Sequence, residues 1–304
     1  MNKQQSSITS LIAAFSRAYH SQMDTPKIFD DYVAKELISP EEFQSIQDHL
    51  IQGIDFFNKD MAIPTKDNVK NLVKWITQIQ LAPTPLARAA YNENVLHHEI
   101  RLGIEQYVIL GAGLDTFPYR HPQLETVVEI FEVDHPTTQA FKKKRLQEAS
   151  LPPMKHLHFV SMDFTKQFQS QPLFEQGFQY KKTFFSLLGV SYYLTKEELA
   201  SLLTHLFALV PSGSSIVLDY ADETLFQENG LFNRVDNMVK MAAAGGEPMK
   251  SCFTYKDMEK MLDPLGLLIY EHLTPPAIQQ LYFQNRTDYL SAFETIHYMH
   301  IVKK

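Results

Sequence analysis

The sequence is poor in cysteine, in basic charge and in long apolar runs, and each shortage excludes a class of protein. Cys252 is the single cysteine among 304 residues, so no disulfide can form within the chain, and we expect a reducing, cytoplasmic location. A net charge of −7 gives no basic surface for nucleic acid or an anionic membrane, and we expect neither as a partner. The first residues also lack the apolar segment of a secretory signal.

One charge-free run, Leu199 to Leu218, has roughly the length of a membrane span. Because Pro211-Ser-Gly-Ser-Ser215 divides the run, we interpret it as a helix followed by a strand within a buried core. With 44% hydrophobic residues, the chain can bury a substantial core. No internal repeat is present.

The first part of the chain, residues 1–102, has apolar residues at helical spacing and is expected to form a helical cap. Ser39 followed by proline and two acids is typical of a helix start. The predicted helices are Ser10–Tyr19, one that opens at Thr25-Pro26, one from Pro40 through Phe57, Asp67–Gln80 and Leu86–Leu102.

Residues 103–304 alternate strands with helices, which predicts a parallel sheet with helical crossovers. The predicted strands are Tyr107–Leu110, Val127–Val133, His156–Val160, Thr183–Leu188, Ser215–Asp219, Gly266–Tyr270 and Thr295–Val302; the predicted helices are His135–Ala149, Lys196–Leu209 and Tyr255–Leu262. The polar stretch 222–250 is too long for an ordinary connection and is interpreted as a lid-like or substrate-binding insertion. We expect a single domain, 1–304, made of the cap and this α/β core.

The most informative motif follows the strand that begins at Tyr107. That strand breaks into the turn Gly111-Ala112-Gly113, and the next strand ends on an acid, Asp134. Glycine lets a backbone approach a ligand closely, and an acid at the neighbouring strand end can hold both hydroxyls of a ribose. The pair therefore indicates a nucleoside-binding sheet.

The loop differs from a dinucleotide-binding loop in two ways. Thr116 occupies the position of a third glycine, and the loop carries an acid, Asp115, which a diphosphate disfavours. S-adenosylmethionine has no phosphate, and an acid or backbone carbonyls can satisfy its ammonium. These features favour S-adenosylmethionine over a nicotinamide cofactor or a sheet without any cofactor.

The third strand is followed by Asp163-Phe164, which fits an adenine site. The carboxylate can accept a hydrogen bond from the adenine amino group while the ring packs on the base. Alternatively, Asp163 caps a short helix over 165–168. The cofactor interpretation gains support because ligands bind at the carboxyl ends of parallel strands.

Three segments together resemble the leucine carboxyl methyltransferase family, and in particular its bacterial branch of S-adenosylmethionine-dependent O-methyltransferases. They are Val108-Ile-Leu-Gly-Ala-Gly-Leu-Asp-Thr-Phe-Pro-Tyr-Arg120, Phe131-Glu-Val-Asp-His-Pro136 and Leu188-Gly-Val-Ser-Tyr-Tyr-Leu-Thr195. The resemblance covers most of the chain. It implies a Rossmann-like class I methyltransferase sheet with an N-terminal helical cap and an antiparallel C-terminal strand.

The resemblance also implies roles for particular residues. Gly111, Ala112 and Gly113 would face the methionine part of the cofactor, Asp134 the ribose, and Asp163 with Phe164 the adenine. Arg88 stands where the family places an arginine that pairs with the cofactor carboxylate, and Arg17 where relatives carry a basic residue. Leu188 replaces a glutamate of several members but is still expected at the cofactor.

Methyl transfer to a carboxylate needs no general base, whereas a phenol or alcohol acceptor needs one. Tyr192, Tyr193, His121 and His135 lie near the expected site, but each is interpreted as structural, so no catalytic residue is assigned. His156 and His158 share one strand face without a third ligand, and we expect no metal. His97-His98-Glu99 is interpreted as a solvated helix end.

The expected function is transfer of a methyl group from S-adenosylmethionine to an oxygen, preferably a carboxylate, of a small molecule. Two alternatives remain open: an NAD(P)-dependent oxidoreductase, and a catalytically silent S-adenosylmethionine-binding regulatory protein. Neither the acceptor nor the oligomeric state follows from the sequence.

Overall fold

The computed structural model describes residues 8–57, 69–166 and 168–304, which form one mixed sheet with a helical cap. The sheet has seven strands in the order β3-β2-β1-β4-β5-β7-β6. The strands are β1 (Gln106–Leu110), β2 (Glu129–Asp134), β3 (Leu157–Ser161), β4 (Thr183–Leu187), β5 (Ser215–Ala221), β6 (Leu267–Leu273) and β7 (Ile296–Lys303). Strands β1 to β5 run parallel, and β7 is antiparallel to both of its neighbours. The predicted sheet and its antiparallel terminal strand are thereby confirmed.

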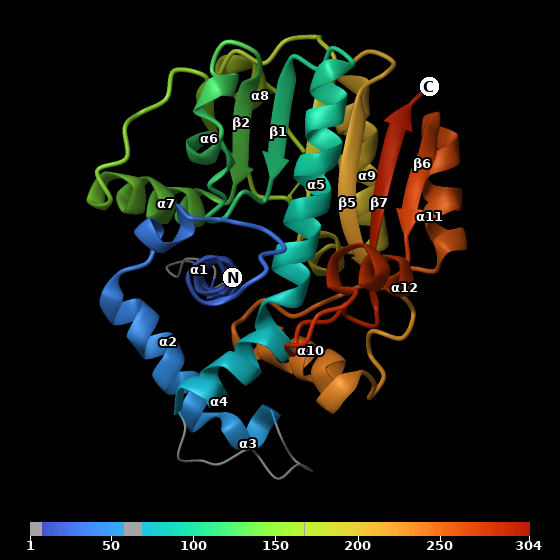
Figure 1. The fold of residues 1–304 in the computed structure, drawn as a ribbon. Helices are drawn as coiled ribbons and strands as arrows, with labels where there is room; N and C mark the ends of the chain where they lie inside the picture. Colours follow the sequence, from blue (N-terminus) through green and yellow to red (C-terminus); the bar gives the residue numbers. More distant parts are fainter. Residues whose placement is uncertain (1–7, 58–68, 167) are drawn as a thin grey trace.

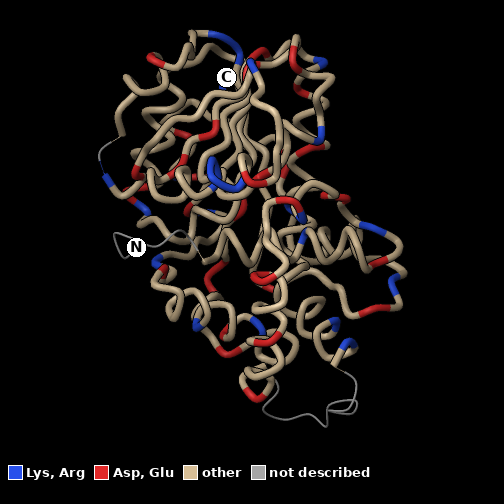
Figure 2. Tube along the Cα trace, turned by 90° about the vertical axis from the view of Figure 1, so that its left-hand side faces the viewer, with Lys and Arg blue, Asp and Glu red and all other residues tan. Residues whose placement is uncertain are grey.

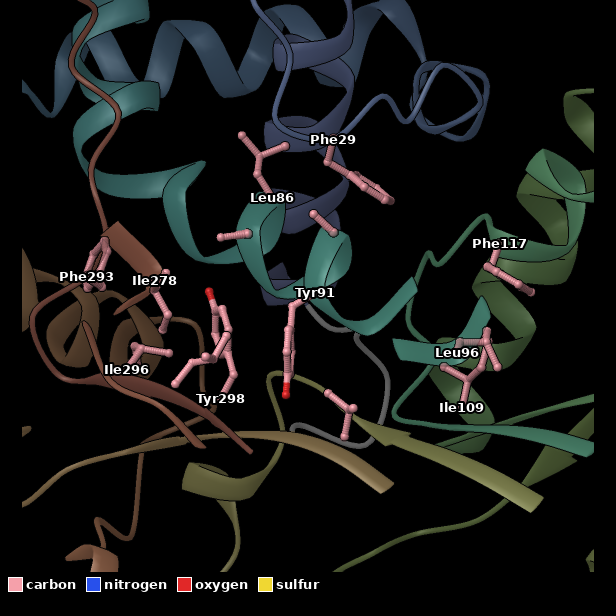
Figure 3. Packing of buried hydrophobic residues seen from close by; sticks show 14 of the residues in the cluster. Phe29, Leu86, Tyr91, Leu96, Ile109, Phe117, Ile278, Phe293, Ile296 and Tyr298 are labelled. Atoms are coloured by element: carbon pink, nitrogen blue, oxygen red, sulfur yellow. The ribbon is translucent and has the colours of Figure 1, made fainter. Parts of the chain in front are cut away.

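Helices cover both faces of the sheet (Figure 1), and every residue of the central strands β1, β4 and β5 is buried. Alternate residues of β1 enter different cores: Tyr107 and Ile109 join one buried cluster, and Val108 and Leu110 join the other. The first cluster includes α5 (Pro83–Arg101), and the second includes α9 (Lys196–Ala208) and α11 (Tyr255–Leu262). Figure 3 shows part of the first cluster, in which the rings of Tyr91 and Tyr298 pack 5.6 Å apart.

The remaining helices of the α/β part are short except for α7. They are α6 (Phe117–Arg120), α7 (Pro136–Glu148), α8 (Gln171–Glu175) and α12 (Pro275–Ile278). A capping box starts α9: the Glu198 amide donates to the Thr195 hydroxyl, and the Thr195 amide donates to the Glu198 carboxylate.

A helical cap lies across the carboxyl ends of the parallel strands, toward which the arrowheads of β1 and β2 point in Figure 1. It consists of α1 (Ile8–Met23), a 3₁₀ turn (Ala34–Leu37), α2 (Pro40–Gln52), α3 (Ile54–Phe57), α4 (Val69–Ile76) and a π-helical turn (Thr77–Leu81). From the 222–250 segment, α10 (Arg234–Ala244) packs beside these elements. Leu114 and Leu146 of the α/β part belong to the apolar cluster of the cap, so the two parts share a core.

The prediction of a helix opening at Thr25-Pro26 is wrong. Residues 24–33 form bends and turns, and only Ala34–Leu37 is helical, as a 3₁₀ turn. Side chains satisfy the backbone there: His20 accepts from the Ile28 amide, and Arg286 donates to the carbonyl of Pro26. The segment therefore does not need intrahelical hydrogen bonds.

Other helix boundaries also differ from the expectation. The helix predicted from Pro40 through Phe57 is divided at Gly53 into α2 and α3. Helix α5 begins at Pro83 rather than at Leu86, because a proline fits the first turn of a helix, where its missing N–H is not needed. The helix expected from Asp67 is described from Val69 onward, and Asp67 itself lies outside the described residues.

Basic and acidic residues are interspersed along the trace (Figure 2). Acidic residues outnumber basic ones, which gives the net charge of −7. Within the described ranges, no helix combines the length and apolar character that crossing a membrane requires.

Candidate active site

A cavity of about 310 Å³ lies between the carboxyl ends of the strands and the cap. All nine residues predicted to contact the cofactor line it: Arg17, Arg88, Gly111, Ala112, Gly113, Asp134, Asp163, Phe164 and Leu188. These residues come from six separate stretches of the chain. Their convergence follows from the parallel topology, which brings the strand ends to one edge.

The glycine turn after β1 admits no side chain at two of its positions. Gly111 has φ +75° and Gly113 has φ +50°, both in the left-handed region. A Cβ atom on Gly111 would lie 2.5 Å from Cγ2 of Val190, and one on Gly113 would lie 3.0 Å from Cβ of Ser10. The turn is therefore compressed between the β4 exit loop and α1, and its backbone faces the cavity.

Asp134 ends β2 with its carboxylate held by the backbone. Oδ2 accepts a hydrogen bond from the Gly113 amide at 2.5 Å, and Oδ1 accepts one from the His135 amide at 2.6 Å. Burial raises the pKa of this carboxyl, and the two amides oppose that rise. Since each carboxylate oxygen accepts more than one hydrogen bond, both can still receive a ribose hydroxyl.

Asp163 stands directly before a turn at Phe164 and Thr165, and among the described residues of 165–168 none is helical, so the alternative interpretation as a helix cap is wrong for them; Gln167 lies outside the described residues. Oδ1 of Asp163 accepts from the amide and the hydroxyl of Thr165, at 3.1 and 2.7 Å. Although burial opposes it, these hydrogen bonds hold the pKa of Asp163 below its usual value. Phe164 lines the same end of the cavity.

Arg88 reaches the cavity from α5, and two side chains hold one of its nitrogens. Nη1 donates to Oδ2 of Asp219 at 3.1 Å and to the Tyr192 hydroxyl at 3.2 Å. Asp219 was not among the predicted site residues. The sequence feature that could have identified Asp219 is an acid within the apolar strand Ser215–Ala221, because a buried charge is costly unless it is paired.

Arg17 forms part of the cavity wall, where it ties α1 to the glycine loop. Nε donates to Oδ2 of Asp31 at 2.8 Å, and Nη2 donates to the carbonyl of Leu114 at 2.8 Å. Asp31 also accepts from Thr116 at 2.5 Å. Although burial opposes it, Arg17 and Arg120 hold the pKa of Asp31 below its usual value. Asp31 was not among the predicted site residues, because it falls within the helix that was wrongly expected to open at Thr25-Pro26.

The far end of the cavity joins α1 to the 222–250 segment. The Thr9 hydroxyl donates to Oε2 of Glu247 at 2.5 Å. Tyr193 and Lys250 line the same region, and burial, followed by the charge of Glu247, raises the pKa of Tyr193 to about 12. The segment predicted as a lid or substrate-binding insertion therefore contributes residues to the cavity wall.

The four residues considered as general bases divide into two groups. Tyr193 and His135 line the cavity, whereas Tyr192 and His121 are not among the lining residues. The Tyr192 hydroxyl accepts from Arg88, and Nδ1 of His135 accepts from the Thr137 amide at the start of α7. His121 lies 3.0 Å from the Glu93 carboxylate.

Glu93, His97 and His121 bring three potential metal ligands within 4.8 Å of one another in the described part of the chain. The stretch His97-His98-Glu99 was expected to be a solvated helix end. This expectation is wrong for His97, which lies in the cluster, and for Glu99, which is buried. Arg120 donates to both oxygens of Glu93, so a guanidinium already neutralises this carboxylate. A cation placed there would face that guanidinium, and the cluster is better described as an ion-pair network.

A mixed sheet of this order, with a glycine turn and an acid at adjacent strand ends, defines a class I methyltransferase. Residues 10–207 match the model of the family described as leucine carboxyl methyltransferase, and the chain belongs to that family. It is therefore an S-adenosylmethionine-dependent methyltransferase, and the nicotinamide alternative is superseded.

Known proteins agree with this assignment. The chain is 62% identical, over the full length of both proteins, to the Bacillus subtilis protein named "Putative S-adenosyl-L-methionine-dependent methyltransferase YktD". It is 28% identical over 217 residues to a Mycobacterium ulcerans protein of the same description, covering 69% of this chain and 64% of that one. A crystal structure of a DUF574 family protein from Streptomyces avermitilis shares the fold, with a TM-score of 0.55 and 16% identity over 84% of this chain and 97% of that one.

Proposed function

We propose that the chain transfers the methyl group of S-adenosylmethionine to a carboxylate oxygen of a small molecule. The observation that carries the proposal is that three ionisable side chains lining the cavity, Tyr193, Glu247 and His135, already take part in other interactions. Burial keeps the Tyr193 phenol protonated, with a pKa of about 12, and Glu247 accepts from Thr9. His135 uses Nδ1 to accept the Thr137 amide. A site whose candidate bases are occupied suits an acceptor that is already ionised at neutral pH.

The chemistry then requires only alignment. A carboxylate oxygen attacks the methyl carbon, the carbon–sulfur bond breaks with its electrons passing to sulfur, and the products are a methyl ester and S-adenosylhomocysteine. No proton is taken up or released. The contribution of the chain is to hold the two reactants in line and to exclude water, which would otherwise solvate the carboxylate.

Lys250 is the residue that we assign to the acceptor. It lines the cavity, and its ammonium lies 3.5 Å from Glu198 in a pair that is partly exposed on both sides. An exposed pair contributes little stability, so Lys250 can exchange Glu198 for an anionic acceptor at little cost. The description of the family, which names a carboxyl group, supports the same acceptor chemistry.

The test is methyl transfer from radiolabelled S-adenosylmethionine to a panel of small carboxylic acids and phenols. A methyl ester releases volatile methanol in mild base, whereas a methyl ether does not. We expect base-labile product and a rate that is independent of pH above the pKa of the acceptor. Base-stable product, or a rate that keeps rising toward the pKa of a phenol, would show that an ether-forming reaction takes place. Binding of S-adenosylmethionine without transfer to any component of a metabolite extract would instead support a regulatory binder.

A further inference from the structure

We infer that Asp219 is the positioning residue of the cofactor site, because it orients Arg88 toward the cofactor carboxylate. This inference rests on the proposed role of Arg88. Asp219 is completely buried in β5, and the Arg88 side chain is 15% exposed, at the edge of the cavity. The two residues lie 131 positions apart in the sequence.

The hydrogen bonds of Arg88 are divided unequally among its nitrogens. Nη1 serves both Asp219 and Tyr192, and it has two hydrogens to donate. Among the residues that the structure describes, none accepts a hydrogen bond from Nη2 or Nε of Arg88. Asp219 and Tyr192 therefore both bind Nη1, and the edge formed by Nη2 and Nε keeps its hydrogens available. Such an edge can bind a carboxylate through two parallel hydrogen bonds.

Asp219 also fixes the surface against which the guanidinium rests. Its Oδ1 accepts from the Gly189 amide at 2.6 Å, while its Oδ2 accepts from Arg88. A Cβ atom on Gly189 would lie 2.6 Å from Nη1 and 2.7 Å from Nη2 of Arg88, so the guanidinium lies directly against the glycine. One carboxylate thus holds both the arginine and the cavity-lining turn that follows β4.

The charge balance agrees with a positioning role. Asp219 neutralises Arg88 in the free protein, so neither charge is buried alone. A cofactor carboxylate on the free edge of Arg88 would bring one more negative charge, together with the positive ammonium and sulfonium of the same ligand. The ion pair can therefore remain intact when the cofactor binds.

The experiment compares two ligands that differ only in the carboxylate: S-adenosylmethionine and its decarboxylated form. Calorimetry gives the dissociation constant of each, and the preference is the ratio of the two. We expect a clear preference for S-adenosylmethionine in the unmodified protein, and its loss in Arg88→Met. In Asp219→Asn, the preference should fall about tenfold or more, the size of one charge-assisted hydrogen bond, while affinity for the decarboxylated ligand changes little.

Two further variants complete the test. Asp288→Asn is the control, because Asp288 also pairs with an arginine, Arg286, at a position that is only 14% exposed and does not line the cavity. It should leave the preference unchanged. Tyr192→Phe removes only the other acceptor of Nη1 and should lower the preference about threefold, so this variant decides the matter if Asp219→Asn does not fold.

The outcomes separate the two assignments. No preference in the unmodified protein would overturn the assignment of Arg88 and, with it, the positioning role. A preference that Arg88→Met removes and Asp219→Asn retains would overturn the positioning role alone. Equal loss of affinity for both ligands in Asp219→Asn would show that Asp219 acts only as a structural ion-pair partner.

Discussion

Replacing Gly111 with alanine tests whether the turn after β1 requires glycine. The expected loss of stability has two parts, which the structure separates. The first part is conformational: φ is +75°, where a residue with a Cβ atom is less stable by about 1–2 kcal/mol. The second part is steric, since the new Cβ would lie 2.5 Å from Cγ2 of Val190, and overpacking of this kind costs about 1–3 kcal/mol. We expect Gly111→Ala to lower the free energy of unfolding by about 2–5 kcal/mol.

The double variant with Val190→Ala distinguishes the two parts. Removing the valine methyl groups relieves the steric part and leaves the conformational part unchanged. In urea unfolding, Gly111→Ala/Val190→Ala should therefore be more stable than the sum of the single variants predicts, by about 1–2 kcal/mol. We also expect Gly111→Ala to weaken S-adenosylmethionine binding, because a displaced Val190 would enter the cavity that it lines.

Strict additivity of the two substitutions would refute the contact between Gly111 and Val190. A single variant as stable as the unmodified protein would refute the left-handed conformation as well. Equal slopes of the unfolding curves are required for either conclusion, because a change in slope would show that the unfolded or native state itself had changed.

The other predictions concern single residues of the same cavity. Asp134→Ala removes the carboxylate that we expect to accept the ribose hydroxyls and should raise the dissociation constant of S-adenosylmethionine at least tenfold by calorimetry; an unchanged constant would place the nucleoside elsewhere. Asp31→Asn should destabilise the protein by about 2–4 kcal/mol at pH 7, because Arg17 and Arg120 lose a buried partner. Since these arginines lower the pKa of Asp31 in the folded state, its stabilisation is present above the unfolded pKa and is lost as the pH falls through the folded value. Denaturation at pH 7 and at about pH 3 should therefore show a smaller difference between variant and unmodified protein at the lower pH. Lys250→Met should raise the KM for a carboxylate acceptor about tenfold while S-adenosylmethionine affinity stays constant, and a matched loss of both would place Lys250 at the cofactor instead.

Much of the fold was predictable because its signals are local. A strand buried on both faces is mostly apolar, as in the run Tyr107–Leu110 of β1, and a capping box such as Thr195 with Glu198 is complete within four residues. The glycine turn and Asp134 were identified for the same reason. Each follows directly after a strand, and parallel strands end at a common edge. The nine predicted cofactor residues consequently lie around one cavity.

The failures involve hydrogen bonds between distant segments. Residues 24–33 contain apolar residues at helical spacing, but their backbone is satisfied by His20 and by Arg286, from the other end of the chain. His97 lies on a helix that looked solvated, and only the fold places His121 beside it. Hydrophobic periodicity predicts which face of an element is buried, but it does not predict which polar side chain forms a hydrogen bond with that element.

Local sequence therefore determined the strands, the caps, the glycine turn and the acid that ends β2, because each depends on neighbours within a few residues. Tertiary structure alone decided how the charges pair: Asp219 with Arg88, and Asp31 with Arg17 and Arg120. A buried charge is stable only beside a compensating group, and the packing of the cap against the sheet selects which group that is.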